Sequence, residues 1–209
     1  MLACWVLALT HGVDIANAAN EDSLIDAACQ GHLEIVKLFV EKGVDVNGKA
    51  TNGVSALMCA SVYGHAKIVE FLLSRGARVN EVDETAETAL LKACCKGFID
   101  VAGLLLEKGA DLNAANRSGI SPLMCASYQG HTGIVEMLLE KNVNVNATDS
   151  TEETALIKAA CKGQTDTVKL LLAGGANSDA HTTNGITSLR CASANGHIEV
   201  VRILMATKK

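Results

Sequence analysis

The chain is short of proline, of aromatic residues and of long apolar segments. Of its 209 residues only one is proline, and 3% are aromatic. A collagen-like or proline-rich chain is therefore excluded, and any hydrophobic core must be built from aliphatic side chains. No apolar run approaches the roughly 18 residues that a membrane-spanning helix requires, so we expect no membrane insertion.

Positive charge is also scarce. The chain has 18 Lys and Arg against 23 Asp and Glu, which gives a net charge of −5. Binding to a phosphate backbone needs a concentrated basic surface, so nucleic acid is not an expected partner. Hydrophobic residues make up 49% and charged residues 20%, and this balance is typical of a globular domain rather than of a disordered chain.

The first nine residues, MLACWVLAL, are similar to the apolar part of a secretory signal, and Ala16-Asn17-Ala18 fits its cleavage rule. No Lys or Arg precedes this run, as a signal would require. The alternative is that residues 1–16 form half of a structural repeat, because WVLALTHGVDI parallels the later KLFVEKGVDV. We favour the half repeat and predict a cytoplasmic protein, with secretion as the less favoured alternative.

Eight cysteines are spread over the chain without a CxxC pair. Two sets each recur at the same constant interval: Cys29, Cys95 and Cys161, and Cys59, Cys125 and Cys191. A disulfide needs Cα atoms within about 7 Å of each other, and regular long spacing predicts thiols that are kept apart. We therefore expect free cysteines that pack as small hydrophobic side chains in a reducing compartment. A redox or metal-binding role is the alternative.

A 33-residue period runs through the whole chain. Three positions keep one residue type through six units. They are Gly31, Gly64, Gly97, Gly130, Gly163 and Gly196; Leu24, Leu57, Leu90, Leu123, Leu156 and Leu189; and Ala27, Ala60, Ala93, Ala126, Ala159 and Ala192. Periods of this length are typical of stacked repeat proteins.

Within one unit, residues 50–82, the pattern predicts two short helices and a loop. Ser55 suits a helix N-cap, and the first helix ends at Gly64, where a left-handed residue is easiest for glycine. Ile68, Val69, Leu72 and Leu73 form the apolar face of a second helix. The other units carry equivalent N-cap residues, which are Thr88, Ser121, Thr154 and Thr187.

These units resemble the ankyrin repeat family, most clearly in ISPLMCASYQGHTGIVEMLLEKNVNVN and VSALMCASVYGHAKIVEFLLSRGARVN. The resemblance implies an all-α solenoid of helix–loop–helix units with hairpin loops, in which hairpin tips and first helices line a concave face. At the positions of the family's TPLH tetrad this chain has SALM, TALL, SPLM, TALI and TSLR instead. We predict one array over residues 1–209, divided into a half repeat (1–16), five repeats (17–49, 50–82, 83–115, 116–148, 149–181) and a C-terminal repeat (182–209).

Alternate units are more alike than neighbours. ETALLKACCKG at 87–97 and ETALIKAACKG at 153–163 share nine of eleven residues. The true period is therefore a 66-residue one that spans two units, which indicates duplication of a two-repeat unit.

The resemblance places partner-facing positions at the hairpin tips and late in the first helices. The even units carry Thr51, Asn52, Val54, Val62, Tyr63, Arg117, Ile120, Tyr128, Gln129, Asn184, Ile186 and Asn195 there. The odd units carry Glu84, Glu87, Lys92, Cys95, Lys96, Glu153, Lys158 and Lys162.

The two sets predict alternating surface stripes. Lys92 and Lys96 lie one helical turn apart on one face, and Lys158 and Lys162 repeat the pattern. Local pairing of these lysines with Glu87 and Glu153 is one interpretation, and a surface for a partner with acidic groups is the other. The two tyrosines, Tyr63 and Tyr128, are candidate anchors because exposed tyrosine is enriched at interfaces.

Two sets of polar residues have structural interpretations. The histidines after the repeat glycines lack the partners that acid–base catalysis needs. The loop residues Asn47, Asn80, Asn113 and Asn146 correspond to positions that asparaginyl hydroxylases can modify in ankyrin proteins. We favour the alternative that they order the loops through hydrogen bonds to nearby backbone.

The predicted function is a non-catalytic scaffold that binds a protein partner, with no cofactor and no metal. The alternatives are a targeting or regulatory segment of a larger enzyme or channel, and a secreted effector. Both ends keep core-type residues where a solenoid needs polar terminal faces, so end-to-end self-association is a further expectation.

Overall fold

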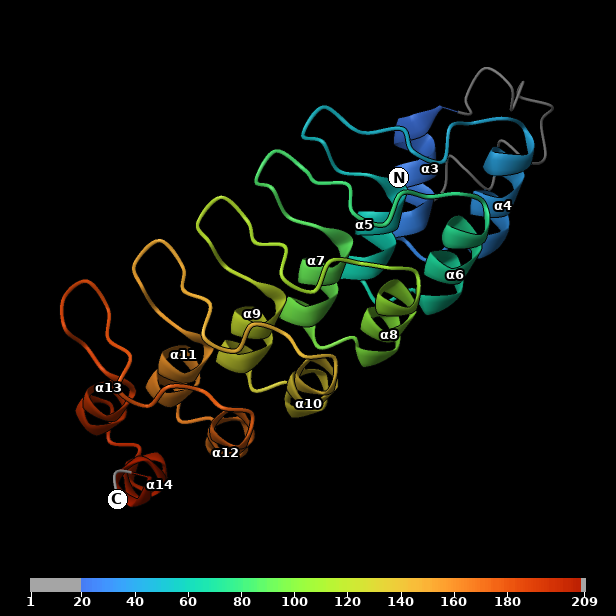
Figure 1. Ribbon diagram of the computed structural model, residues 1–209. Coiled ribbons are helices and arrows are strands. Elements are labelled where there is room, and N and C mark those ends of the chain that lie inside the picture. The colour runs from blue at the N-terminus through green and yellow to red at the C-terminus, as the bar shows by residue number, and fades with distance from the viewer. Residues whose placement is uncertain (1–19, 208–209) are drawn as a thin grey trace.

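A computed structural model describes residues 20–207, in which short helices are joined by turns and hairpin loops (Figure 1). The helices come in pairs, one pair for each 33-residue unit. The pairs are α3 (Glu21–Cys29) with α4 (Leu33–Glu41), α5 (Ala56–Val62) with α6 (Ala66–Ser74), α7 (Ala89–Lys96) with α8 (Ile99–Glu107), α9 (Pro122–Gln129) with α10 (Thr132–Glu140), α11 (Ala155–Lys162) with α12 (Thr165–Ala173), and α13 (Ser188–Ala194) with α14 (Ile198–Ala206).

The pairs stack into two rows of helices. The first helices (α3, α5, α7, α9, α11 and α13) form one row and the second helices form the other, with the hairpin loops stacked along one edge (Figure 1). This arrangement confirms the predicted all-α solenoid. The half repeat proposed for residues 1–16 lies outside the described residues.

All five predicted N-cap residues cap their helices. The Ser55 hydroxyl accepts a hydrogen bond from the backbone N–H of Met58, and Thr88, Ser121, Thr154 and Thr187 cap their helices in the same way. Each cap satisfies one N–H that the first helical turn would otherwise leave unpaired. At four units a single antiparallel bridge closes the hairpin just before the helix, as between Lys49 and Ser55.

The core lies between the two rows and follows the 33-residue period. Leucine and alanine of the first helices, such as Leu90 and Ala93, are completely buried, as are Val69 and Leu72 of a second helix. Alanine at this position leaves room for neighbouring first helices to approach closely. The aliphatic core that the composition predicts is therefore continuous along the stack.

A side chain of the next unit lies against the glycine that ends the first helix in each of the first five units: Gly31, Gly64, Gly97, Gly130 and Gly163. A Cβ at Gly64 would lie 2.4 Å from the Phe98 ring, and one at Gly31 would lie 2.7 Å from the His65 ring. Both glycines also have left-handed backbone, with φ of 75° and 78°. The glycine row is therefore needed for the contact between units as well as for ending the helix.

Candidate functional site

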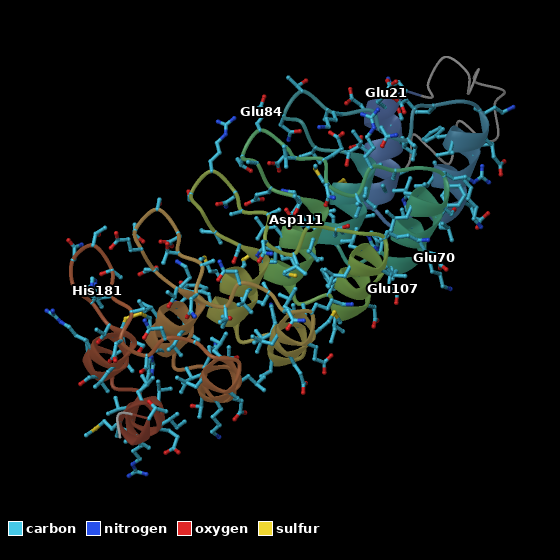
Figure 2. The ribbon with its side chains drawn as sticks, in the orientation of Figure 1. Glu21, Glu70, Glu84, Glu107, Asp111 and His181 are labelled. Carbon is cyan, nitrogen blue, oxygen red and sulfur yellow. A yellow bond between two sulfur atoms is a disulfide. The ribbon has the colours of Figure 1, made fainter. Side chains whose placement is uncertain are left out.

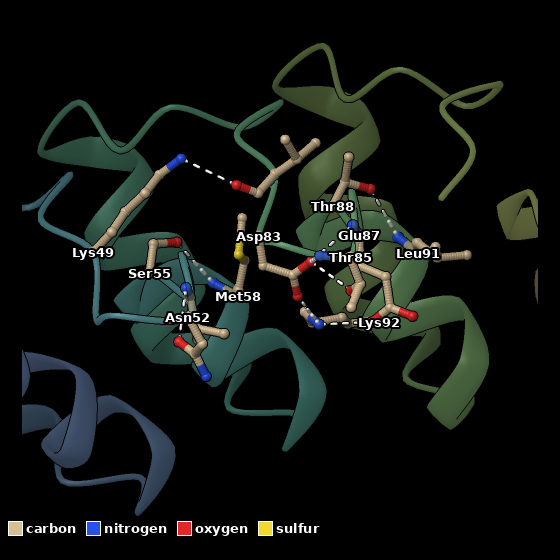
Figure 3. Close-up of polar contacts among 12 residues, drawn as sticks. Lys49, Asn52, Ser55, Met58, Asp83, Thr85, Glu87, Thr88, Leu91 and Lys92 are labelled. Carbon is tan, nitrogen blue, oxygen red and sulfur yellow. Dashed lines mark hydrogen bonds and ion pairs between the residues drawn. The ribbon is translucent and has the colours of Figure 1, made fainter. Parts of the chain in front are cut away.

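The acidic hairpin tips of the odd units are built around one aspartate each. Asp83 Oδ1 accepts hydrogen bonds from the Thr85 N–H (2.9 Å), the Thr85 hydroxyl (2.7 Å) and the Glu87 N–H (3.0 Å). Figure 3 shows these bonds folding the tip over the carboxylate. Asp149 makes the same bonds in the tip one double repeat later.

The remaining carboxylate oxygen of Asp83 pairs with a half-buried lysine. Lys92 Nζ lies 2.6 Å from Asp83 Oδ2 and 2.7 Å from Glu87 Oε2 (Figure 3). Only 13% of the Lys92 side chain and 6% of the Asp83 side chain are exposed. Lys158 repeats the arrangement with Asp149 and Glu153.

Hydrogen bonding determines the ionisation of this cluster. Burial alone would raise the pKa of Asp83, but hydrogen bonds from Lys92, Thr85 and the Glu87 backbone outweigh it and lower the pKa to about 2. Burial alone would lower the pKa of Lys92, but its bonds to Asp83 and Glu87 raise it. The tip is therefore a closed ion cluster at neutral pH.

These contacts separate the lysines of the stripe into two groups. For Lys92 and Lys158 the local pairing with Glu87 and Glu153 is confirmed, and sequence reasoning missed the aspartates that complete it. Lys92 and Lys158 are engaged inside their own units, so only Lys96 and Lys162 of the stripe are exposed to solvent. A sequence signal was present, because both odd units place Asp four residues before the Glu of the ETAL motif.

The other candidate residues divide into exposed and half-buried groups. The exposed group is Thr51, Asn52, Tyr63, Glu84, Lys96, Arg117, Tyr128, Gln129, Lys162, Asn184 and Asn195. The half-buried group is Val54, Val62, Glu87, Lys92, Cys95, Ile120, Glu153, Lys158 and Ile186. Figure 2 shows Glu84 at a hairpin tip, away from Glu107 on the second-helix row.

The two tyrosines are among the most exposed large apolar side chains of the described chain. Tyr63 is 58% exposed and Tyr128 is 40% exposed. Lys162 of the next unit places its ammonium 4.6 Å from the centre of the Tyr128 ring. This cation–π contact joins an exposed tyrosine to one of the two exposed lysines in a single surface feature.

The prediction of separated, free thiols is wrong for six cysteines. Disulfides link Cys29 to Cys59, Cys95 to Cys125, and Cys161 to Cys191, with Cα atoms 4.8, 5.0 and 5.0 Å apart. Equivalent cysteines of successive double repeats, such as Cys29 and Cys95, are not bonded to each other. The two cysteines of each disulfide have a sequence separation of 30. The second cysteine therefore lies in the next unit, about one helical turn before the position that is equivalent to the first.

Of the remaining cysteines, Cys94 is fully buried, and burial raises the pKa of its thiol to about 12. It fits the predicted role of a small hydrophobic side chain. Cys4 lies outside the described residues. Cys95 cannot offer a thiol to a partner as long as it is bonded to Cys125.

The histidines and loop asparagines connect consecutive units. His65, His131 and His197 each bond through Nε2 to a backbone carbonyl of the preceding unit, at 3.0, 3.3 and 3.0 Å. The accepting carbonyls belong to Cys29, Cys95 and Cys161. This confirms the structural interpretation of these histidines.

Asn80 spans two hairpins. Its amide donates to the Gly109 carbonyl (3.1 Å) and its carbonyl accepts from the Asp111 N–H (2.8 Å). Asn47 and Asn146 make equivalent pairs of bonds. The asparagines do bond to backbone, but to the backbone of the next unit rather than of their own loop.

The described residues form neither a metal cluster nor a membrane-spanning helix. Within residues 20–207 no three or more His, Cys, Asp or Glu side chains gather closely enough to hold a metal ion. In the same part of the chain no helix has the length and apolarity needed to cross a membrane.

Comparison with known proteins agrees with this geometry. The family model described as "Ankyrin repeats (3 copies)" matches residues 2–83, 79–149 and 142–209. The chain belongs to the ankyrin repeat family. Ankyrin repeats generally mediate protein–protein interaction, and the fold is typically a non-catalytic interaction module.

A solved ankyrin structure covers most of the chain. The ankyrin repeat domain of human ASB11 superimposes with a TM-score of 0.82 at 34% identity, over 89% of this chain and 83% of that one. No curated protein sequence matches the chain.

Proposed function

We propose that this ankyrin array is a non-catalytic scaffold that binds a protein partner through the predicted concave face of hairpin tips and first helices. The observation that carries the proposal is the exposed pair of Tyr128 and Lys162, which joins two consecutive units. Tyrosine next to an exposed cation offers both an apolar and a polar contact, which is typical of interface anchors.

The distribution of charge supports the same face. The internal pairing of Lys92 and Lys158 removes two charges that would have to be desolvated on binding. Lys96 and Lys162 remain exposed at the ends of α7 and α11, while Glu84 is exposed at a neighbouring tip. We propose a partner that presents an apolar segment flanked by charged groups of both signs.

A paired capture experiment tests this proposal. The Tyr63→Ala, Tyr128→Ala variant is compared with the native chain as bait, after circular dichroism shows that both are folded. The matched control is Glu70→Ala, Glu107→Ala, which changes two side chains of the second-helix row (Figure 2). We expect a partner that is retained by the control and lost from the tyrosine variant. The same partners on all three baits would place the interface elsewhere.

Self-association through the C-terminal unit stays a prediction. Ile198 is 68% exposed and Met205 is 63% exposed. Gly163 is covered by the His197 ring, whereas no described atom lies within 4 Å of a Cβ built at Gly196. We expect sedimentation velocity to show concentration-dependent association that an Ile198→Lys, Met205→Lys variant loses. A native chain that stays monomeric at high concentration would contradict it.

The cytoplasmic location also stays a prediction. The glutathione of the cytosol keeps most thiols reduced, whereas disulfides persist in oxidising compartments. The three disulfides therefore favour the alternative of secretion if they are permanent, and are compatible with the cytoplasm if they are reversible. Fractionation of cells with an antibody to the chain tests the location directly.

A further inference from the structure

The three disulfides occur at alternate joints of the stack. Each links a first helix of an odd unit to the first helix of the following even unit: α3 to α5, α7 to α9, and α11 to α13. At the other two joints, positions that correspond to the cysteines hold Val62 and Lys92, and Tyr128 and Lys158. The cysteine pairs are therefore a feature of the double repeat, placed three times at the same register.

The bonded joints are held together by other contacts as well. At the first joint the His65 ring packs against Gly31 and bonds to the Cys29 carbonyl. Leu24 of α3 and Leu57 of α5 are buried in the core, at 1% and 2% exposure. None of these contacts involves a sulfur atom, so opening the disulfide leaves the joint's packing and hydrogen bonds in place.

Each disulfide has at least one partly exposed cysteine, unlike the remaining described one. Five of the six are half-buried and Cys59 is 7% exposed, whereas Cys94 is 0% exposed. Thiol–disulfide exchange needs a thiolate that a second sulfur compound can reach. The burial of Cys94 keeps it out of this chemistry, although Cys95 is its neighbour in sequence.

We propose that Cys29–Cys59, Cys95–Cys125 and Cys161–Cys191 are three reversible thiol–disulfide modification sites, closed by exchange with a small disulfide such as glutathione disulfide and opened by exchange with the corresponding thiol. The proposal does not depend on the proposed partner. In closing, the thiolate of one cysteine attacks the small disulfide, forms a mixed disulfide and releases one thiol. The thiolate of the second cysteine then attacks the sulfur of the first cysteine in this mixed disulfide, which forms the protein disulfide and releases the second small thiol. Two protein thiols are oxidised and one small disulfide is reduced to two thiols.

Closing the sites couples the units in pairs. The backbones on either side of each bonded joint are held within bridging distance, with Cα atoms about 5 Å apart. The joints between α5 and α7 and between α9 and α11 carry no such bond among the described cysteines. The oxidised array is a row of three modules, each of two units joined by a disulfide, and the reduced array is a row of six units held by packing and hydrogen bonds.

The experiment uses the full chain, reduced and then equilibrated in buffers with graded ratios of glutathione to glutathione disulfide. Free thiols are blocked with N-ethylmaleimide and the chain is analysed by intact mass and peptide mapping. We expect up to three bridges with the pairing above, two fewer maleimide labels on the chain for each bridge formed, and full reversal when reduced glutathione is restored. Far-ultraviolet circular dichroism should be the same at both extremes.

Two variants keep the test sharp. Cys95→Ser should lose one bridge, leave Cys125 labelled and keep the other two pairs, whereas Cys94→Ala should keep all three. If Cys95→Ser does not fold, Cys125→Ser gives the same test from the other partner. Three outcomes would each overturn the proposal: cysteines that stay reduced at every glutathione ratio, bridges with other pairings, and loss of helical signal on reduction. The last would make the bonds permanent structural links.

Discussion

Replacing Gly64 with alanine should destabilise the array more than a glycine at a helix end usually does. Two effects add at this position. The left-handed backbone, with φ of 75°, costs an alanine about 1–2 kcal/mol. The new methyl group would also lie 2.4 Å from two atoms of the Phe98 ring, and such overpacking costs about 1–3 kcal/mol. We expect a total loss of about 2–5 kcal/mol.

Gly76 provides the matched control within the same unit. Its φ of 87° is also left-handed, but no described atom beyond its two chain neighbours lies within 4 Å of a Cβ built there. Gly76→Ala should therefore show the backbone cost alone, about 1–2 kcal/mol. The difference between the two variants measures the contact between consecutive units.

The assay is urea unfolding followed by circular dichroism in the far ultraviolet, under fixed redox conditions. A double-mutant cycle with Phe98→Ala isolates the steric part, because removing the ring should cancel most of the extra cost of Gly64→Ala. Equal losses for Gly64→Ala and Gly76→Ala, or no coupling with Phe98→Ala, would refute the reasoning that the glycine row is needed for stacking.

Three further predictions follow from the polar contacts. Lys92→Met leaves Asp83 and Glu87 without their cation and should lower the free energy of unfolding by about 1–3 kcal/mol. This loss is smaller than for a fully buried pair because the cluster is partly solvated. As a control, Lys37→Met breaks an exposed pair with Glu34 and should cost less than about 1 kcal/mol in the same urea assay. Folding lowers the pKa of Asp83 from 3.8 to about 2, so the ionised carboxylate stabilises the fold at any pH above the pKa that Asp83 has in the unfolded chain. This contribution is lost as the pH falls through about 2. Asp83→Asn should therefore cost more at pH 6 than at pH 2, and equal costs would contradict the assignment. Asn80→Ala removes two bonds between hairpins and should cost about 1–3 kcal/mol, with faster hydrogen exchange at the Asp111 amide; unchanged exchange there would argue against the bridge.

Much of this fold can be predicted from the sequence because a solenoid is built from local information repeated. The N-cap at Ser55, the left-handed Gly64 and the buried faces of the two helices depend on contacts a few residues apart along the chain. Repetition of one residue type at a constant interval then requires that the units stack. All of these predictions concern backbone conformation and apolar burial, and the structure confirms them.

The candidate site was predicted less completely, because its polar contacts depend on side-chain direction. The pairing of Lys92 with Glu87 was among the interpretations open from sequence. The part played by Asp83 was not, because its carboxylate reaches Lys92 only after the hairpin tip folds back over the helix N-terminus. That closure turned two predicted partner-facing lysines into internal ones.

The repeat, its doubling, the helix pairs and the aliphatic core follow from the order of residues along the chain. Which residues of consecutive units meet depends on how the helices pack in three dimensions. Cys29 and Cys59 are 30 residues apart, and the amide of Asn80 ends at Gly109, 29 residues on. Neither distance equals the period, because stacking aligns a residue with one a helical turn earlier or a few loop positions earlier in the next unit. That offset comes from how the helices pack, and no comparison of equivalent positions along the chain contains it.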